Sequence, residues 1–204
     1  MDVAPDVSMA DPATESDTMR AFVERYFGTD EAFGVTFIAD DGTCYTPSES
    51  DSLYARRGDA CPALSAQFPD GSITNCTGYA MRIYRALPDR AQIYGFENCD
   101  NPTSRVAREE IHPGGHDFAV IDERYIVDPW VRLVPGACSQ ICFDLADPVD
   151  AAFALDLYGP RACWTRNEAA ERFSRTLDPG GWHGASGDAI AADDGDSQLD
   201  HPHV

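Results

Sequence analysis

Three residues of the sequence carry the groups that a thiol-dependent enzyme needs: Cys76, His116 and Asp128. A thiolate attacks a carbonyl carbon, an imidazole moves the proton, and a carboxylate orients the imidazole and stabilises its protonated form. Each residue type alone more often fills a core or a turn. Together they predict acyl transfer through a thioester, provided that the fold brings the three side chains to one place.

Cys76 stands at the start of the most regular segment of the chain, which we predict as a buried helix over residues 75–87. Apolar residues recur there at helical spacing. The free N–H groups and the positive dipole end of the first turn favour a thiolate and an oxyanion. Asn75 and Gln67, the latter on a short helix predicted over 61–67, are both candidates for a further oxyanion donor.

His116 and Asp128 lie on two predicted strands, 116–121 and 125–131, that form a hairpin. If residues 122–124 are a three-residue loop, the two side chains share one face of the hairpin, a diagonal step apart and within hydrogen-bond reach. A two-residue loop would turn Asp128 to the opposite face. The triad hypothesis therefore depends on the longer loop.

Three segments resemble the papain-like and transglutaminase-like cysteine superfamily: NCTGYA (75–80), GHDFAV (115–120) and YIVDPW (125–130). The resemblance covers roughly residues 60–135, and the compact spacing is similar to that of bacterial papain-fold toxins and glutamine deamidases. It implies an α+β fold in which a central Cys-bearing helix packs on an antiparallel sheet. It also implies roles for four residues: Cys76 as nucleophile, His116 as general base and acid, Asp128 as orienting group and Trp130 as a wall of the site.

The chemistry implied by the resemblance is that of a cysteine-dependent amide hydrolase or acyltransferase. If water resolves the thioester, the enzyme is a peptidase or a glutamine deamidase, and if an amine does so, it is a transglutaminase. The residues leave this choice open because it depends on pocket shape and water exclusion. The expected partner is a peptide or protein substrate, a basic one being an option, and no cofactor is expected.

The charge of the chain limits its partners. Among 204 residues, 15 are basic and 35 acidic, which gives a net charge of −20, and every basic residue is Arg. Such a surface repels nucleic acid and anionic membranes, so neither is an expected partner. The same charge supports an alternative function, a non-catalytic acidic binding module on a papain-like frame that docks on a basic protein.

The cysteines suggest a reducing compartment and no metal site. An odd count of 7 argues against a disulfide framework, and no secretory signal is visible. We therefore expect the protein in the cytoplasm, or exported without a visible signal. Cys138 and Cys142, spaced i, i+4, could share a helix face and join other ligands in a zinc site, namely Cys99, Cys163 or His112. The paired CxxC pattern of such sites is missing, so no metal is expected.

The rest of the chain supplies the frame around these residues. We predict an α+β domain over 17–179, between a disordered acidic arm (1–16) and a disordered acidic tail (180–204). Cys61, before Pro62, is the rival nucleophile. Further predicted elements are, in chain order, a helix over 17–27, a hairpin of 34–38 and 43–45, a loop over 46–60, a strand over 91–96, a polar loop from 98 to about 115, and helices over 149–157 and from 167 to 177.

Overall fold

A computed structural model describes residues 12–108, 114–133 and 139–176. The predicted tail, 180–204, and residues 1–11 of the predicted arm lie outside the described residues. Helix α1 spans Pro12–Phe27, so residues 12–16 are helical and do not belong to the arm. Proline suits the first turn of a helix, since its missing N–H has no partner there in any case.

The main sheet confirms an α+β fold with an antiparallel sheet. Its strands follow the order β7-β6-β5-β4-β8. Every pairing in it is antiparallel. The strand bounds are Ala91–Glu97 for β4, Gly115–Ile121 for β5, Tyr125–Val127 for β6, Cys142–Asp144 for β7 and Thr165–Arg166 for β8.

The hairpin of β5 and β6 has the predicted register. Ile121 pairs with Tyr125, so the connecting loop holds three residues. Asp122 and Glu123 take the left-handed conformation in this loop, with φ of 52° and 56°. Strand β6 is shorter than the predicted 125–131, because Pro129 lacks the N–H that a central strand needs and begins the 3-10 helix η3 (Pro129–Leu133).

Helix α3 (Cys76–Ala86) confirms the predicted buried helix, with Asn75 as its N-cap and Leu87 as its C-cap. It packs on β5 and β4, and α6 (Glu168–Ser174) packs on α3 in turn. The helix buries most of its length, including Tyr79, Ile83 and Tyr84. The cysteine-bearing helix therefore lies against the strand that carries His116.

The other helices of this body surround the sheet. Helix α5 (Pro148–Tyr158) packs on β7, and α4 (Arg105–Arg108) packs on α5 inside the segment predicted as a polar loop. The 3-10 helix η4 (Arg161–Cys163) links α5 to β8. Helices α5 and α6 confirm the two helices predicted in the last third of the chain. No helix in the described parts of the chain is long and apolar enough to cross a membrane.

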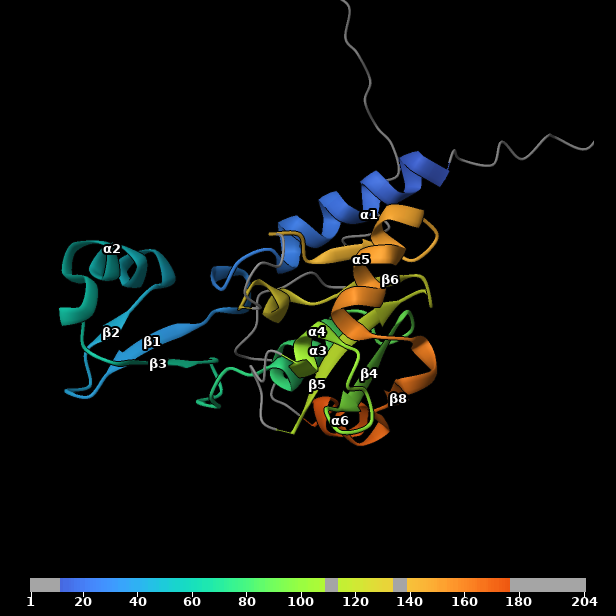
Figure 1. The fold of residues 1–204 in the computed structure, drawn as a ribbon. Helices are drawn as coiled ribbons and strands as arrows, with labels where there is room; N and C mark the ends of the chain where they lie inside the picture. Colours follow the sequence, from blue (N-terminus) through green and yellow to red (C-terminus); the bar gives the residue numbers. More distant parts are fainter. Residues whose placement is uncertain (1–11, 109–113, 134–138, 177–204) are drawn as a thin grey trace, which may run out of the picture.

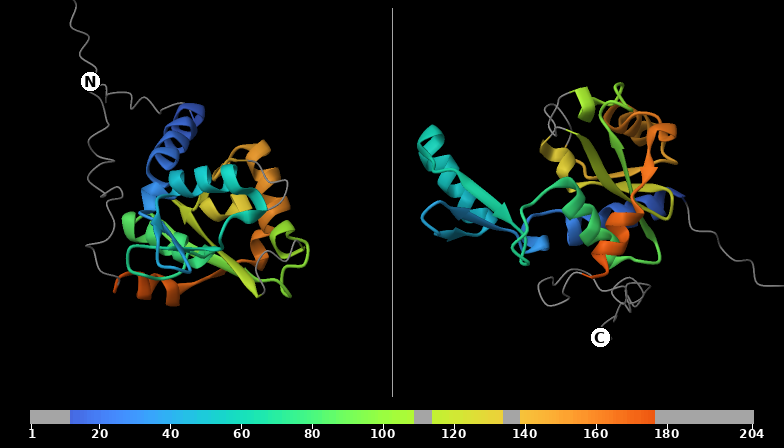
Figure 2. Two further views of the ribbon diagram at one scale, coloured as in Figure 1. Left: turned by 90° about the vertical axis from the view of Figure 1, so that its left-hand side faces the viewer. Right: turned by 90° about the horizontal axis from the view of Figure 1, so that it is seen from below.

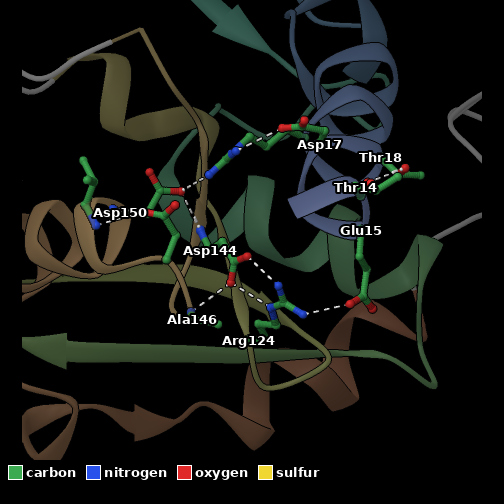
Figure 3. Close-up of polar contacts among 11 residues, drawn as sticks. Thr14, Glu15, Asp17, Thr18, Arg124, Asp144, Ala146 and Asp150 are labelled. Atoms are coloured by element: carbon green, nitrogen blue, oxygen red, sulfur yellow. Dashed lines mark hydrogen bonds and ion pairs between the residues drawn. The ribbon is translucent and has the colours of Figure 1, made fainter. Parts of the chain in front are cut away.

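An ion-pair cluster ties α1 to the edge of the main sheet (Figure 3). Arg124, in the loop between β5 and β6, donates to both carboxylate oxygens of Asp144 at 2.8 and 2.7 Å. The same guanidinium donates to Glu15 of α1 at 2.9 Å, and Arg20 of α1 donates to Asp150 at 2.9 Å. These contacts explain why residues before the predicted helix start are ordered against the body.

A smaller lobe projects from one side of this body (Figures 1 and 2). Its three-stranded sheet has the order β2-β1-β3, with bounds Thr36–Ala39 for β1, Cys44–Tyr45 for β2 and Leu64–Gln67 for β3. Helix α2 (Pro47–Arg57) packs on β1 and β2. The 3-10 helices η1 (Glu31–Phe33) and η2 (Gly58–Ala60) lie just before β1 and just after α2.

This lobe contradicts two predictions. The predicted loop over 46–60 contains α2, which Thr46 and Glu49 cap reciprocally and which Pro47 begins. The predicted helix over 61–67 is wrong, because residues 64–67 pair with β1 as strand β3. A nonlocal pairing overrides the weak local preference of Leu64-Ser65-Ala66-Gln67.

Candidate active site

Cys76 lies at the amino end of α3, and its side chain is buried except for a small exposed fraction. Asn75 caps the helix by accepting a hydrogen bond of 2.6 Å from the N–H of Gly78. The N–H groups of the first two helical residues, Cys76 and Thr77, have no acceptor within a helix. The sulfur is therefore next to donors and to the positive end of the helix dipole, which both favour a negative charge.

His116 sits inside the sheet layer with a side chain that is 0% exposed. Its Nε2 lies 2.7 Å from Oδ2 of Asp128. Its ring is stacked near the rings of Phe118 and Tyr158, with centroid distances of 6.1 and 6.0 Å, and these two rings contact each other at 4.7 Å. This aromatic pair and the carboxylate at one nitrogen hold the imidazole in one orientation.

Asp128 is fixed from three directions although it follows the end of β6. Besides His116, it accepts a hydrogen bond of 3.0 Å from the N–H of Trp130 and another of 3.0 Å from the hydroxyl of Tyr158. The residue is only 2% exposed. A carboxylate held by several donors can orient an imidazole and stabilise its protonated form.

The second ring nitrogen of His116, Nδ1, is buried and has no hydrogen-bond partner of ordinary geometry. Burial acts to lower the pKa of His116, but Asp128 and then Cys76 outweigh it and raise this pKa to about 10. The thiol group is thus close enough to Nδ1 to interact with it. Such contacts are often long or poorly aligned until a substrate binds. The arrangement places a basic nitrogen where it can take the proton of the thiol.

The next residue of each element makes a second contact between α3 and β5. The hydroxyl of Thr77 donates to Asp117 at 2.6 Å. The amide of Asn167 donates to the two oxygens of the same carboxylate at 3.3 and 3.2 Å. The pair Cys76-Thr77 therefore faces the pair His116-Asp117, and this contact fixes the helix end against the strand.

A cavity of about 740 Å³ opens beside these two pairs. Cys76, Thr77, His116 and Asp117 form part of its wall. The end of β4, Asp100, the two glycines 114–115 and residues of the segment 162–167 form the rest. The cavity brings space for a substrate to the sulfur and to the imidazole.

The structure brings Cys76, His116 and Asp128 together, but not the other predicted site residues. Gln67 ends β3 in the small lobe and does not line the cavity. Asn75 is engaged in capping α3 and does not line the cavity either. Trp130 packs its ring on Tyr79 of α3, with centroids 5.9 Å apart, and does not line the cavity.

The other cysteines considered in the sequence analysis do not lie in the predicted settings. Cys61 opens no helix, since it follows η2 and precedes β3. Cys142 lies on strand β7, not on a helix face, and burial raises the pKa of its thiol to about 12. Cys138 and His112 are outside the described residues. Among the residues that the structure describes, no group of three His, Cys, Asp or Glu side chains could hold a metal ion.

Sequence reasoning missed two polar residues of the site. Tyr158, at the end of α5, contacts Asp128 only because the fold brings these distant residues together. No local sequence pattern indicates this contact. Asp117 was not among the predicted site residues. The sequence did offer one signal for Asp117. It directly follows His116, as Thr77 directly follows Cys76, so a contact between Cys76 and His116 also brings Thr77 close to Asp117.

Comparisons of the chain with protein-family models, with curated proteins and with solved structures find no match. The functional argument therefore depends on the geometry around Cys76 and on elementary chemistry.

Proposed function

We propose that this protein is a cysteine-dependent amide hydrolase or acyltransferase of the papain-like and transglutaminase-like kind. Cys76 is the nucleophile, His116 the general base and acid, and Asp128 the orienting group. The observation that carries the proposal is the buried contact of 2.7 Å between His116 and Asp128, on an imidazole whose other nitrogen is left without a partner beside the thiol. The nitrogen on the side of the thiol is thus the one available for proton transfer.

The first half-reaction forms a thioester. The sulfur of Cys76, having given its proton to Nδ1 of His116, attacks the carbonyl carbon of an amide, and a C–S bond forms. The oxyanion of the tetrahedral intermediate is within the field of the free N–H groups at the start of α3. Nδ1 then returns the proton to the nitrogen of the leaving amine, and the C–N bond breaks.

The second half-reaction releases the acyl group. A water molecule or an amine gives a proton to Nδ1 and attacks the thioester carbon, after which the C–S bond breaks and the proton returns to the sulfur. Throughout both steps Asp128 stays ionised and holds Nε2, so Nδ1 is the nitrogen that exchanges protons. Water gives a peptidase or a glutamine deamidase, and an amine gives a transglutaminase.

The test is selective alkylation of the full chain. Iodoacetamide at mildly acidic pH, followed by peptide mass spectrometry, measures the labelling rate of each thiol in one sample. We expect Cys76 to react faster than the exposed thiols of Cys44 and Cys99, since thiolate is the reactive form. His116→Ala should slow Cys76 and leave those two controls unchanged. Equal labelling rates for all thiols, together with no effect of His116→Ala on the rate at Cys76, would refute the enzyme proposal.

Turnover assays then separate the three reaction outcomes. Release of ammonia from glutamine peptides marks a deamidase, new amino termini mark a peptidase, and incorporation of an amine marks a transglutaminase. Cys76→Ala should abolish whichever signal is found. If no turnover is found and a basic protein binds equally to the chain and to Cys76→Ala, the acidic binding module predicted as the alternative is the better account.

A further inference from the structure

We propose that the cavity beside Cys76 selects a cationic group, an ammonium or a guanidinium, and that Asp117 is the residue that binds it. This inference deepens the proposed function, on which it rests for the reaction, because it names the class of substrate. The observations that carry it are the charges on the cavity wall, the surroundings of Asp117 and the unpartnered nitrogen of His116.

The cavity wall is acidic. Glu97, Asp100 and Asp117 line it, and Arg166 is the one Lys or Arg side chain among the described residues of the wall. Arg166 is not free to offset them, because it donates two hydrogen bonds of 2.9 Å to the buried Glu171. A positive charge on His116 is likewise offset by Asp128. Three carboxylates of the wall thus remain without a compensating cation among the described residues.

Asp117 directly follows His116, and its carboxylate accepts a hydrogen bond from Thr77, the residue after Cys76. It is half-buried, and its printed partners, the hydroxyl of Thr77 and the amide of Asn167, are both neutral donors. Because these donors carry no charge, an incoming ammonium or guanidinium would form the stronger, charge-assisted hydrogen bond with this carboxylate. Thr77 and Asn167 meanwhile hold its oxygens in place at the cavity wall.

Gly95 leaves room for this carboxylate. It pairs with Asp117 across β4 and β5, and a Cβ at position 95 would lie 2.1 Å from Oδ1 of Asp117. Any side chain at this position would therefore displace the carboxylate from its place at the cavity wall. Glycine at this place is consistent with a binding surface built around Asp117.

The Nδ1 of His116 is an observation separate from the charges that points to a ligand in this cavity. It belongs to a fully buried ring that lines the cavity, lacks a hydrogen-bond partner of ordinary geometry, and lies on the ring edge away from Asp128. A buried polar atom without such a partner requires an explanation, and proton exchange with the thiol and a substrate provides one. A cation held by Asp117 would thus lie within one residue of the two groups that react.

Two sources can supply the cation. One is a Lys or Arg side chain next to the amide that Cys76 attacks, and the other is the protonated amine of an acyl acceptor waiting to resolve the thioester. The net charge of −20 raises the local concentration of either one. Both sources share the same chemistry at Asp117, so the experiment begins with the charge and then separates them.

The experiment measures the electrostatic preference of the thiol without any need for turnover. Two methanethiosulfonates of similar size, one with a trimethylammonioethyl and one with a sulfonatoethyl group, modify Cys76, and mass spectrometry gives both rates. Each rate is divided by the rate of the same reagent with free cysteine, which gives a corrected rate. We expect the corrected rate of the cationic reagent to be about tenfold that of the anionic reagent, and we expect this cation-to-anion ratio to decrease in high salt. A corrected ratio near one in the unmodified chain would overturn the proposal.

Variants assign the preference to Asp117. Asp117→Asn should reduce the cation-to-anion ratio about threefold, whereas Asp51→Asn, on the exposed face of α2, should leave it unchanged. An unchanged ratio in folded Asp117→Asn overturns the assignment. If circular dichroism shows that this variant does not fold, Glu97→Gln combined with Asp100→Asn replaces it on the exposed rim, and an unaltered ratio there counts against the proposal.

Peptide substrates separate the two sources. Matched peptides with arginine or its neutral isostere citrulline beside the target amide report on a substrate side chain, and incorporation of a diamine compared with a neutral alkylamine reports on an acceptor. If neither comparison favours the cation, selection of a cationic substrate is refuted. The failure of the proposed function looks different. If both reagents label Cys76 slowly and His116→Ala does not change the rates, the proposed thiol chemistry is refuted. The ratio of the cationic to the anionic labelling rate can still be measured in that case, so the two failures are distinguishable.

Discussion

The hydroxyl of Tyr158 donates a hydrogen bond of 3.0 Å to Oδ2 of Asp128, the oxygen that also lies 2.7 Å from Nε2 of His116. One buried carboxylate oxygen therefore links the end of α5 to the hairpin of β5 and β6. This contact makes α5 part of the site, although it lies far from Cys76 in the sequence.

Tyr158→Phe removes this hydrogen bond without a change in shape. Because the acceptor is a buried carboxylate, we expect the free energy of unfolding to fall by about 1.5–3 kcal/mol, measured by urea denaturation. Tyr54→Phe, at a tyrosine that is 43% exposed on α2, is the matched control and should change it by less than about 0.5 kcal/mol. Equal effects of the two variants would contradict the role of the Tyr158 hydroxyl.

Asp128→Asn tests the charge at the orienting position while it keeps the size of the side chain. Asp128 is the strongest of the groups that raise the pKa of His116 against the effect of burial, so this pKa should fall in the variant. Alkylation of Cys76 at mildly acidic pH should then slow by about tenfold, since each pKa unit changes the charged fraction by that factor. Asp122→Asn is the control. The carboxylate of Asp122 binds Arg90 and lies outside the site, so this variant should leave the alkylation rate of Cys76 unaltered.

The protonation of His116 should also appear in the stability of the protein. Burial acts to lower its pKa, but Asp128 and Cys76 raise it from 6.5 to about 10, so the folded state holds the proton more tightly than the unfolded state. The resulting stabilisation is complete below pH 6.5 and is lost as the pH rises through about 10. The difference in unfolding free energy between the unmodified chain and His116→Gln should therefore decrease over this window. Other groups, such as the buried thiol of Cys142, are present in both proteins and cancel in the difference. A constant difference would show that His116 is not protonated in the folded state.

Gly95→Ala tests whether the position of the Asp117 carboxylate matters. The added Cβ would lie 2.8 Å from the carbonyl oxygen of His116 as well as 2.1 Å from Oδ1 of Asp117, so both the strand and the carboxylate must shift. We expect a loss of about 1–3 kcal/mol in unfolding free energy and a lower preference of Cys76 for cationic reagents. Gly42→Ala is the control: its Cβ meets nothing within 4 Å, and its φ of +83° costs stability without any effect at the cavity.

The parts of the site that the sequence predicted are those with local signals. Helix α3 was predictable because apolar residues follow its period up to Pro88, and the register of β5 and β6 was predictable from the three-residue loop. These two elements place Cys76 and His116. Asp128 lies where the register puts it, although the strand itself ends one residue earlier because Pro129 follows.

The missed parts depend on contacts between distant segments, with one exception. Strand β3 forms only because β1 offers it an edge, and Tyr158 reaches Asp128 only after α5 packs against the main sheet. No local pattern contains either contact. Helix α2 is the exception, since Thr46, Pro47 and Glu49 carry a capping box that the composition of the segment obscured.

Asn75 offers a last test, which separates a structural role from a catalytic one. Its Oδ1 accepts a hydrogen bond of 2.6 Å from the N–H of Gly78, and its Nδ2 donates to the carbonyl of Ile73 at 3.4 Å. As a cap alone, Asn75→Ala should cost about 1 kcal/mol of unfolding free energy, and Asn75→Ser should restore most of it because serine caps a helix equally well. Labelling and turnover at Cys76 should recover along with stability in the serine variant.

If Asn75 donates to the oxyanion, Asn75→Ser would instead fold normally and label normally but turn over far more slowly, because its side chain is too short to reach the intermediate. The capping geometry and the absence of Asn75 from the cavity wall favour the first outcome, with the oxyanion left to the free N–H groups of α3.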